Sequence, residues 1–355
     1  MLKRALRTIT VRVSRIVAFT TWWVIGLWTA LAVFFNAPLP TWLEALIALV
    51  IVAIFILATR ERFRLYRWFA TPWRAKRYTA AALVLTAAVF TCYFAFMHPN
   101  PNLEWESDHA RVPHVSIQGN KIHIANVRDF DWQSPQGVTP TFVDRDYDLN
   151  AINSMNYVLC PLRGFDGIAH VFVCFGFSGG RHVAVSVEGR RAKGRPYRVF
   201  PSLFRQYQLI YVVGDERDVV GVRGAVWKSP VYFYPVRTSP QNMRAIFLDM
   251  MLRAHSLEEH PEYYNLITNN CLNNITHHLR RLTGQKLFDD LEVLFTGLSD
   301  RVAYNLGFLD TDLPFDKARQ AYRADPWMQS TTLDDTFSDR LRAAIDSQVA
   351  KLHGS

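Results

Sequence analysis

The sequence predicts a mixed α/β protein of the α+β type, with a bundle of apolar helices followed by a domain built on an antiparallel sheet. Three long apolar runs occupy residues 16–35, 43–59 and 79–97. From residue 114 the pattern changes to short runs of alternating apolar and polar residues, which is typical of strands. A helix-like segment that carries one cysteine, residues 263–284, follows the strands.

The apolar runs are long enough to cross a bilayer, although the second is short and has Glu44 at its edge. Tryptophans lie mostly near the ends of the runs, where interfacial aromatic residues belong. A cleaved signal peptide is not expected, because three runs follow one another and no small-residue cleavage site dominates the first. Residues 1–98 are therefore predicted to be a membrane anchor with three transmembrane helices.

The charge is concentrated in this anchor. The chain of 355 residues has a formal net charge of +9. Residues 1–98 hold 12 Lys and Arg against only Glu44 and Glu61, which leaves 28 basic and 29 acidic residues for the remainder. The part beyond the anchor is nearly neutral, so it carries no sign of a basic groove, and nucleic acid is not an expected partner.

The same basic residues predict an orientation. Five precede the first run and seven lie between residues 60 and 77, whereas residues 36–42 and the stretch after the third run have none. Basic loops stay in the cytoplasm. We therefore expect a multi-pass protein of the bacterial inner membrane, with a cytoplasmic N-terminus, a periplasmic C-terminal domain and the lipid bilayer as a partner.

Beyond the anchor we expect a linker at 99–112, a periplasmic domain at 113–310 and a C-terminal helical tail at 311–355. The linker begins with the helix-breaking string HPNP. Residues 114–127 predict a hairpin with a turn at 118–121. The charged turn at 214–218 is expected to form a salt-bridged brace, and apolar residues at helical spacing predict a helix over 240–257.

A second hairpin is predicted over residues 168–190, because two runs rich in Val and Phe flank the turn Ser178-Gly179-Gly180-Arg181. With the turn centred near Gly179, position 170 faces position 188 across the strands. His170 would then stand beside Glu188, as an imidazole that a carboxylate orients for general base catalysis. His182 lies at the turn, and it becomes the alternative base if the register slips by one residue.

Residues 263–284 read YYNLITNNCLNNITHHLRRLTG. Asn is a favoured N-cap residue, so Asn270 predicts a helix that starts at Cys271 and ends at Gly284. A thiol in the first turn of a helix feels the positive end of the dipole, which favours the thiolate. Cys271 is therefore a candidate nucleophile, and the alternative is an inert buried thiol. His277 and His278 are expected on the helix surface.

The other cysteines and histidines indicate no further chemistry. Four cysteines are too few for a disulfide framework, although the sequence leaves open a bridge between Cys160 and Cys174. Neither H-x-x-x-H nor H-E-x-x-H spacing occurs. We therefore expect no metal and no cofactor.

The string YNLITNNCLNNI, with a histidine-bearing strand upstream, resembles the permuted papain-like cysteine hydrolases, in which the His strand precedes the Cys helix. The blocks IAHVFVCFGF, HVAVSVEGR, SLFRQYQLIYVVGDERD and TNNC resemble the Lnb N-terminal periplasmic domain family, over roughly residues 114–310. The resemblance implies a papain-like α/β fold with His170 and Cys271 as the site residues and Glu188 as a third member. His182 departs from the apolar or aromatic residue expected there in relatives.

The expected function is a membrane-anchored thiol hydrolase or acyltransferase that acts on an amide or ester bond of a cell-envelope peptide, lipoprotein or lipid. Cys271 would attack the carbonyl, with His170 as base and then acid and Glu188 orienting the imidazole. The main-chain N–H of Cys271, with Asn270 or Asn269, would support the oxyanion. The alternative is a non-catalytic envelope protein that binds a protein or lipid partner through the same domain.

Overall fold

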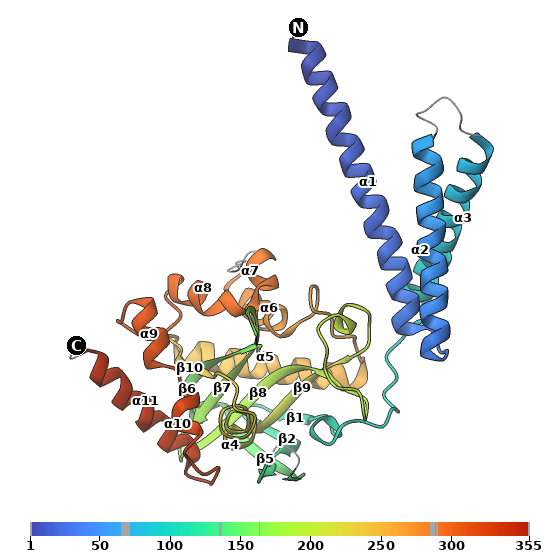
Figure 1. Cartoon of the computed structure of the whole chain (residues 1–355). Helices are drawn as coiled ribbons and strands as arrows, with labels where there is room; N and C mark the ends of the chain where they lie inside the picture. Colours follow the sequence, from blue (N-terminus) through green and yellow to red (C-terminus); the bar gives the residue numbers. More distant parts are fainter. Residues whose placement is uncertain are drawn as a thin grey trace. The chain divides into compact units, whose positions relative to one another are not determined.

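The computed structural model of the chain describes residues 2–64, 72–134, 137–162, 164–284, 288 and 290–353. The chain forms two compact units. The first, here the helical unit, comprises Met1–Pro99 and Phe204–Gln206, and the second, here the sheet unit, comprises Asn100–Leu203 and Tyr207–Ser355. Each is described separately below (Figure 1).

The helical unit contains the three predicted apolar helices. They are α1 (Leu2–Asn36), α2 (Thr41–Arg64) and α3 (Pro72–Thr91), which continues into a π-helical turn, η1 (Cys92–Phe96). Each contains a stretch that is long and apolar enough to cross a membrane, namely Ile9–Asn36, Thr41–Arg60 and Lys76–Phe96. Most side chains in these stretches point away from the protein, as expected for helices that have lipid as their solvent.

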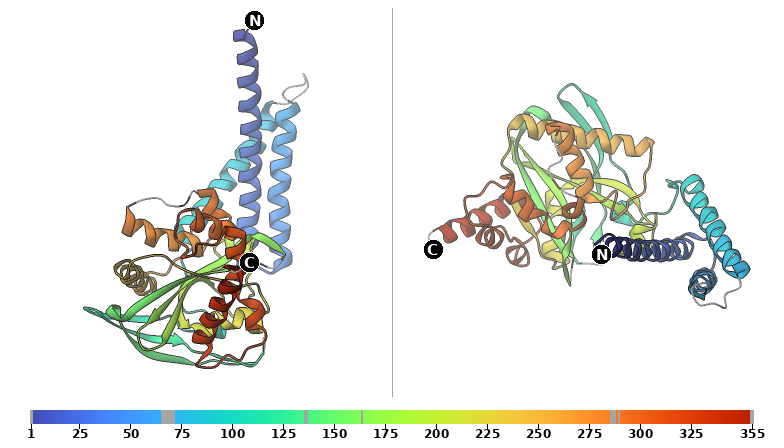
Figure 2. Two further views of the ribbon diagram at one scale, coloured as in Figure 1. Left: turned by 90° about the vertical axis from the view of Figure 1, so that its left-hand side faces the viewer. Right: turned by 90° about the horizontal axis from the view of Figure 1, so that it is seen from above.

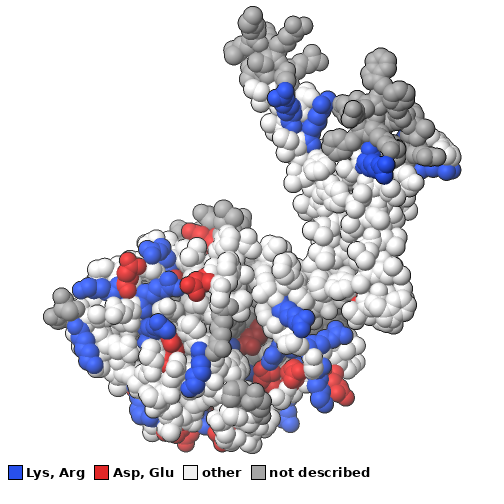
Figure 3. All heavy atoms as spheres, viewed as in Figure 1, with Lys and Arg blue, Asp and Glu red and all other residues white. Residues whose placement is uncertain are grey.

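The described basic side chains of α1, α2 and α3 gather at one end of these helices (Figure 3). This end carries Arg12 and Arg15 of α1, Arg60 of α2, and Lys76 and Arg77 of α3. The connection between α2 and α3, which includes the basic residue at position 67, lies outside the described residues. The grouping follows directly from the alternation of basic and uncharged loops in the sequence.

The sheet unit is built on a mixed sheet, which confirms the predicted α/β class. In the described part of the chain its strands follow the order β1-β2-β9-β8-β7-β6-β10, and β5 also pairs with β2. All pairs are antiparallel except β2 and β9, which meet in parallel at Arg128 and Gly214. The strands are β1 (His114–Gln118), β2 (Lys121–Arg128), β5 (Phe142–Asp148), β6 (Ile152–Leu162), β7 (Phe165–Phe177), β8 (Arg181–Arg190), β9 (Gln208–Asp215) and β10 (Tyr232–Pro235). A small separate ladder pairs β3 (Asp131–Trp132) with β4 (Val138–Thr139).

The register predicted for the hairpin β7–β8 is confirmed. Phe172 pairs with Ser186, and Cys174 pairs with Ala184. Continuing this register by two residues places His170 opposite Glu188. The turn uses Gly179 and Gly180 at φ of 95° and 80°, a backbone conformation that residues with a Cβ rarely adopt.

Helices cover both faces of the sheet (Figures 1 and 2). On one face, α5 (Pro240–Glu259) inserts Phe247 against Phe175 and Phe177 of β7, at ring distances of 5.0 and 5.5 Å. On the other, Arg342 of α11 (Phe337–His353) bonds to Asn156 of β6 and to Glu216 of α4 (Glu216–Val219). A second π-helical turn, η5 (Val222–Val226), follows α4.

The segments after α5 complete the unit. They are α6 (Cys271–Thr283), α7 (Asp290–Leu294), η6 (Thr296–Leu298), α8 (Ser299–Asn305), α9 (Phe315–Ala321) and α10 (Asp325–Met328), followed by α11. Phe337, Leu341 and Ile345 of α11 are buried in the same hydrophobic core as the sheet. The final helix thus packs on the sheet through its apolar stripe.

The predicted salt-bridged brace at residues 214–218 is confirmed. Asp218 is fully buried and accepts hydrogen bonds from Arg128 Nε at 2.8 Å and Nη2 at 3.0 Å. It also accepts from the Phe130 main-chain N–H at 3.0 Å and from Trp132 Nε1 at 2.7 Å. A buried carboxylate with four donors ties α4 to the end of β2 and to the loop that follows.

Candidate active site

The helix that carries the candidate nucleophile begins as the sequence predicts. Asn270 caps α6 by accepting from the Asn273 main-chain N–H at 2.8 Å, and Asn273 Oδ1 accepts from the Asn270 N–H at 2.8 Å. Gly284 ends the helix in the left-handed conformation, with φ of 68°. Cys271 is therefore the first helical residue, at the positive end of the dipole.

Cys271 lies in a cavity of about 380 Å³ that His170 and Glu188 also line. The Cys271 thiol is a near enough neighbour of His170 to raise the pKa of the imidazole. The walls further include Leu162, Ile168 and Ala169 of the β6–β7 hairpin, together with Tyr197, Val199, Tyr264, Leu266 and Thr296 from later loops. The structure thus brings together the thiol, the imidazole and the carboxylate that the sequence proposes.

A serine stands between the imidazole and the carboxylate. His170 Nε2 lies 2.7 Å from Ser186 Oγ, which donates to Glu188 Oε1 at 2.6 Å, whereas Nε2 and Oε1 are 3.6 Å apart. Because the serine proton goes to Glu188, Ser186 Oγ is left to accept the proton on His170 Nε2. The remaining ring nitrogen, Nδ1, is then the one available to the Cys271 thiol.

Glu188 is held by two further groups that sequence reasoning did not identify. Arg223 of η5 donates from Nη2 to Oε1 at 2.8 Å, and His109 Nε2 lies 3.0 Å from Oε2. Burial by itself raises the pKa of Glu188, but the charge of Arg223, the hydrogen bond from His109 and the neighbouring His170 outweigh burial and hold this pKa well below its usual value. Glu188 is therefore an ionised carboxylate throughout the neutral range.

His109 belongs to η2 (Ser107–His109), in the segment predicted as a linker, and it is only 2% exposed. Its Nδ1 accepts from the Arg191 main-chain N–H at 3.2 Å. A neutral imidazole that accepts at Nδ1 carries its proton on Nε2, so His109 donates to Glu188. The segment that precedes the first strand thus contributes a side chain to the site.

The pKa of His170 is raised above its ordinary value. Burial lowers this pKa, and the charge of Arg223 also lowers it, but the neighbouring Cys271 thiol and Glu188 carboxylate together outweigh both. The protonated imidazole is thereby favoured beside the thiol. This is the electrostatic setting in which a cysteine acts as a thiolate.

Both asparagines proposed as oxyanion support have their side-chain amides engaged elsewhere. Asn270 Nδ2 donates to the carbonyls of Leu266 and Val293, at 2.7 and 3.3 Å. Asn269 Nδ2 donates to Glu262 Oε2 and to the Tyr263 carbonyl. The main-chain N–H of Cys271, the first of α6, has no acceptor within its own helix, so it is the donor that remains for an oxyanion.

The alternative base, His182, lies at the turn end of the hairpin, where it pairs with Gly176. Its Nε2 is 3.5 Å from Asp339 of α11, and burial lowers its pKa. It does not line the cavity that contains Cys271. The confirmed register therefore favours His170 as the partner of the thiol.

The expectation that His278 lies on the helix surface is wrong. His278 is 2% exposed, with Nε2 at 2.7 Å from the Tyr211 hydroxyl and Nδ1 at 2.7 Å from Asp249. It faces the sheet because it lies one turn after Asn274, which is also buried on that side of α6. The preceding residue, His277, is exposed.

All four cysteines are free, so the bridge left open between Cys160 and Cys174 is not formed. Cys160 lies opposite His170 on β6 and lines the same cavity. Burial raises its pKa to about 12, and burial also raises the pKa of Cys174 well above the ordinary value. Both remain neutral thiols at physiological pH.

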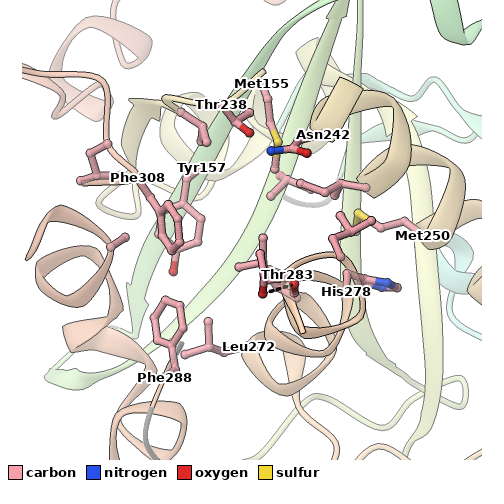
Figure 4. A pocket seen from close by; sticks show the side chains of 18 residues that line it. Met155, Tyr157, Thr238, Asn242, Met250, Leu272, His278, Thr283, Phe288 and Phe308 are labelled. Carbon is pink, nitrogen blue, oxygen red and sulfur yellow. Dashed lines mark hydrogen bonds between the residues drawn. The ribbon is translucent and has the colours of Figure 1, made fainter. Parts of the chain in front are cut away.

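A second cavity, of about 120 Å³, lies on the other side of α6 (Figure 4). Leu272, Ile275 and Leu279 of α6 face Met155, Met250 and Phe308 across it, and its lining is mostly apolar. Cys271 is not part of this lining. The apolar stripe of α6 therefore faces the second cavity, while the start of the helix presents the thiol to the first.

Replacing Ser186 by alanine is expected to lower the alkylation rate of Cys271 by about tenfold, the equivalent of about 1.4 kcal/mol for one lost hydrogen bond to a charged group. The variant leaves His170 Nε2 without its acceptor, so the orientation of the ring is lost. The measurement is the pseudo-first-order rate with iodoacetamide. Ser338→Ala, which changes a buried serine of α11, is the control, and an equal loss of rate there would show that the serine acts only through folding.

Residues 139–297 match the family model described as the Lnb N-terminal periplasmic domain. The matched range contains His170, Ser186, Glu188, Arg223 and Cys271, whereas His109 precedes it. Comparisons with curated proteins and with solved structures found no match. The similarity to a periplasmic domain family, together with three apolar N-terminal helices, indicates a membrane-associated protein of the cell envelope.

Proposed function

We propose that this chain, whose residues 139–297 match a periplasmic domain family, is a membrane-anchored thiol hydrolase or acyltransferase with a permuted papain-like site. One observation carries the proposal: the Cys271 thiol, at the start of a helix, shares a cavity with an imidazole that a serine and a carboxylate orient. Candidate substrates are amide or ester bonds in cell-envelope peptides, lipoproteins or lipids.

The proposed topology is that of a three-span protein of the bacterial inner membrane, with the N-terminus in the cytoplasm and the sheet unit in the periplasm. It is supported by the basic side chains gathered at one end of the helical unit (Figure 3). The test introduces single cysteines, Arg12→Cys or Leu39→Cys, and measures their accessibility in intact cells. Labelling of position 12 but not 39 by an impermeant maleimide would overturn the orientation.

In the proposed reaction the Cys271 thiolate adds to the carbonyl carbon, and the oxygen takes the electron pair beside the Cys271 main-chain N–H. His170 then gives its proton to the leaving nitrogen or oxygen as the carbon–heteroatom bond breaks. This leaves a thioester on Cys271 and a neutral imidazole. His170 next accepts a proton from water or an acceptor amine or alcohol, which attacks the thioester; the carbon–sulfur bond breaks, and Cys271 leaves as the thiolate beside the restored imidazolium.

The second candidate is a non-catalytic envelope protein, and the burial of Cys271, which is 2% exposed, favours it. The two candidates differ in the thiol pKa. Alkylation of the full chain as a function of pH gives this value. A pKa near or above the ordinary cysteine value of about 8.5 would favour the binding protein, and a clearly lower one the enzyme.

Glu188→Gln is expected to lower the pKa of His170, because it removes the negative charge that favours the imidazolium. A raised His pKa contributes stability that is complete below the unfolded value of about 6.5 and is lost as the pH rises through the folded value. The variant should therefore lose the imidazolium at lower pH than the wild type. Histidine-selective NMR titration measures it, with His182→Gln as the control that leaves the His170 signal unchanged.

A further inference from the structure

Four segments beside the cavity that contains Cys271 each present a large apolar side chain to the exterior. The exposed residues are Phe165 (52%), Phe200 (71%), Ile267 (53%) and Leu298 (52%). Each lies within three residues of a cavity-lining residue, namely Leu162 or Ile168, Val199, Leu266 and Thr296. We call these four exposed residues the apolar rim.

Two of these segments are hydrogen-bonded to each other. Thr296 Oγ1 accepts from the Ala169 main-chain N–H at 2.8 Å and donates to its carbonyl at 2.7 Å, which fixes the loop of Leu298 to the strand of Phe165. Leu162 and Tyr197, which line the cavity, are themselves 39% and 37% exposed. Exposed apolar side chains gathered beside one cavity mark an interaction surface.

The loop that bears Phe200 is also cationic. Residues 193–200 read KGRPYRVF, and Lys193, Arg195 and Arg198 are exposed beside Tyr197 and Phe200. Aromatic side chains interspersed with Lys and Arg are typical of segments that sit at the boundary between acyl chains and headgroups. Cations there attract anionic phospholipids.

We propose that the apolar rim and the cationic loop form a docking surface for the lipid bilayer, with anionic phospholipid as the headgroup that is recognised. The sheet unit begins at Asn100, directly after the candidate spans, so a bilayer is always within reach of it. Docking places the opening of the Cys271 cavity at the membrane interface. Exposed residues of the sheet unit make up this surface, whether or not Cys271 is catalytic.

The test uses the full chain in vesicles of phosphatidylethanolamine, with or without phosphatidylglycerol. Cysteine is placed singly at Phe165, Phe200 or Leu298, in a Cys92→Ser, Cys271→Ser background, and labelled with bimane. Ser178→Cys is the matched control, because it is exposed at the opposite end of β7, about 40 Å along the strand from Phe165. Quenching by a lipid with a nitroxide on its acyl chain is compared with quenching by iodide.

The rim positions are expected to be quenched by the lipid nitroxide at least about threefold more than position 178, and the excess should grow with phosphatidylglycerol. Replacing Lys193, Arg195 and Arg198 by Gln should abolish that growth. Rim labels quenched by iodide as strongly as position 178 would overturn the docking surface, and quenching indifferent to phosphatidylglycerol would overturn the anionic headgroup. Because all labelled variants lack Cys271, failure of the proposed enzyme activity leaves this result unaffected.

Discussion

Cys271→Ala is expected to remove at least about 90% of the iodoacetamide labelling of the chain at neutral pH, in a Cys92→Ser background. Cys160 and Cys174 are buried thiols with raised pKa values, so they contribute little thiolate. Cys271 combines a helix N-terminus with a neighbouring imidazole in the same cavity. The measurement is labelling stoichiometry by mass spectrometry after a fixed exposure.

Two controls separate reactivity from folding. Cys160→Ala removes a thiol from the same cavity and should leave the labelling unchanged. Circular dichroism and the thermal midpoint of Cys271→Ser should match those of the wild type, because the exchange is nearly isosteric and a helix N-terminus accepts serine readily. Equal labelling of the wild type and Cys271→Ala would contradict a reactive Cys271 and leave the binding protein as the better candidate.

The sequence was informative about this site wherever a local rule applied. The N-cap asparagine and the glycine stop defined α6 to the residue, and the Gly-rich turn defined the β7–β8 register that sets His170 opposite Glu188. Ser186 was within reach of the same reasoning, since alternation places it on the face of Glu188 two residues away. The sequence predicts the pairing of His170 with Glu188 but not the Ser186 hydroxyl that lies between them.

His109 and Arg223 were out of reach, because no local rule connects them to Glu188. His109 lies 79 residues before Glu188, and Arg223 lies in a π-helical turn 35 residues after it. Their contact with the carboxylate depends on how η2 and η5 pack at the end of β8, which is a tertiary property. For the same reason the sequence did not distinguish the buried His278 from the exposed His277, because the side of α6 that meets the sheet is set by packing.

The charged turn shows the opposite case, in which a sequence feature predicted a tertiary contact correctly. A cluster of acidic and basic residues between two strands is either solvated or paired, and here Asp218 is paired inside the protein. Its partner Arg128 also donates from Nη1 to the Asp108 carbonyl at 3.4 Å. The brace therefore reaches the segment that holds His109 against Glu188, and it links the stability of the sheet unit to the geometry of the site.

Asp218→Ala is accordingly expected to destabilise the sheet unit by about 3–5 kcal/mol, because it leaves the buried guanidinium of Arg128 without a counter-ion and removes acceptors from Phe130 and Trp132. For a unit of this size the thermal midpoint should fall by about 10 °C. The measurement is thermal unfolding of the full chain in nanodiscs, followed by near-ultraviolet circular dichroism.

The matched control is Asp310→Ala, which breaks an ion pair with Arg237 in which both side chains are more than half exposed. An exposed pair contributes about 0–1 kcal/mol, so this midpoint should move by no more than about 3 °C. Asp218→Ala should also slow alkylation of Cys271 below the melting temperature, because His109 loses its support through Asp108. A midpoint that falls equally in both variants would contradict the brace, and unchanged alkylation would show that it acts on stability alone.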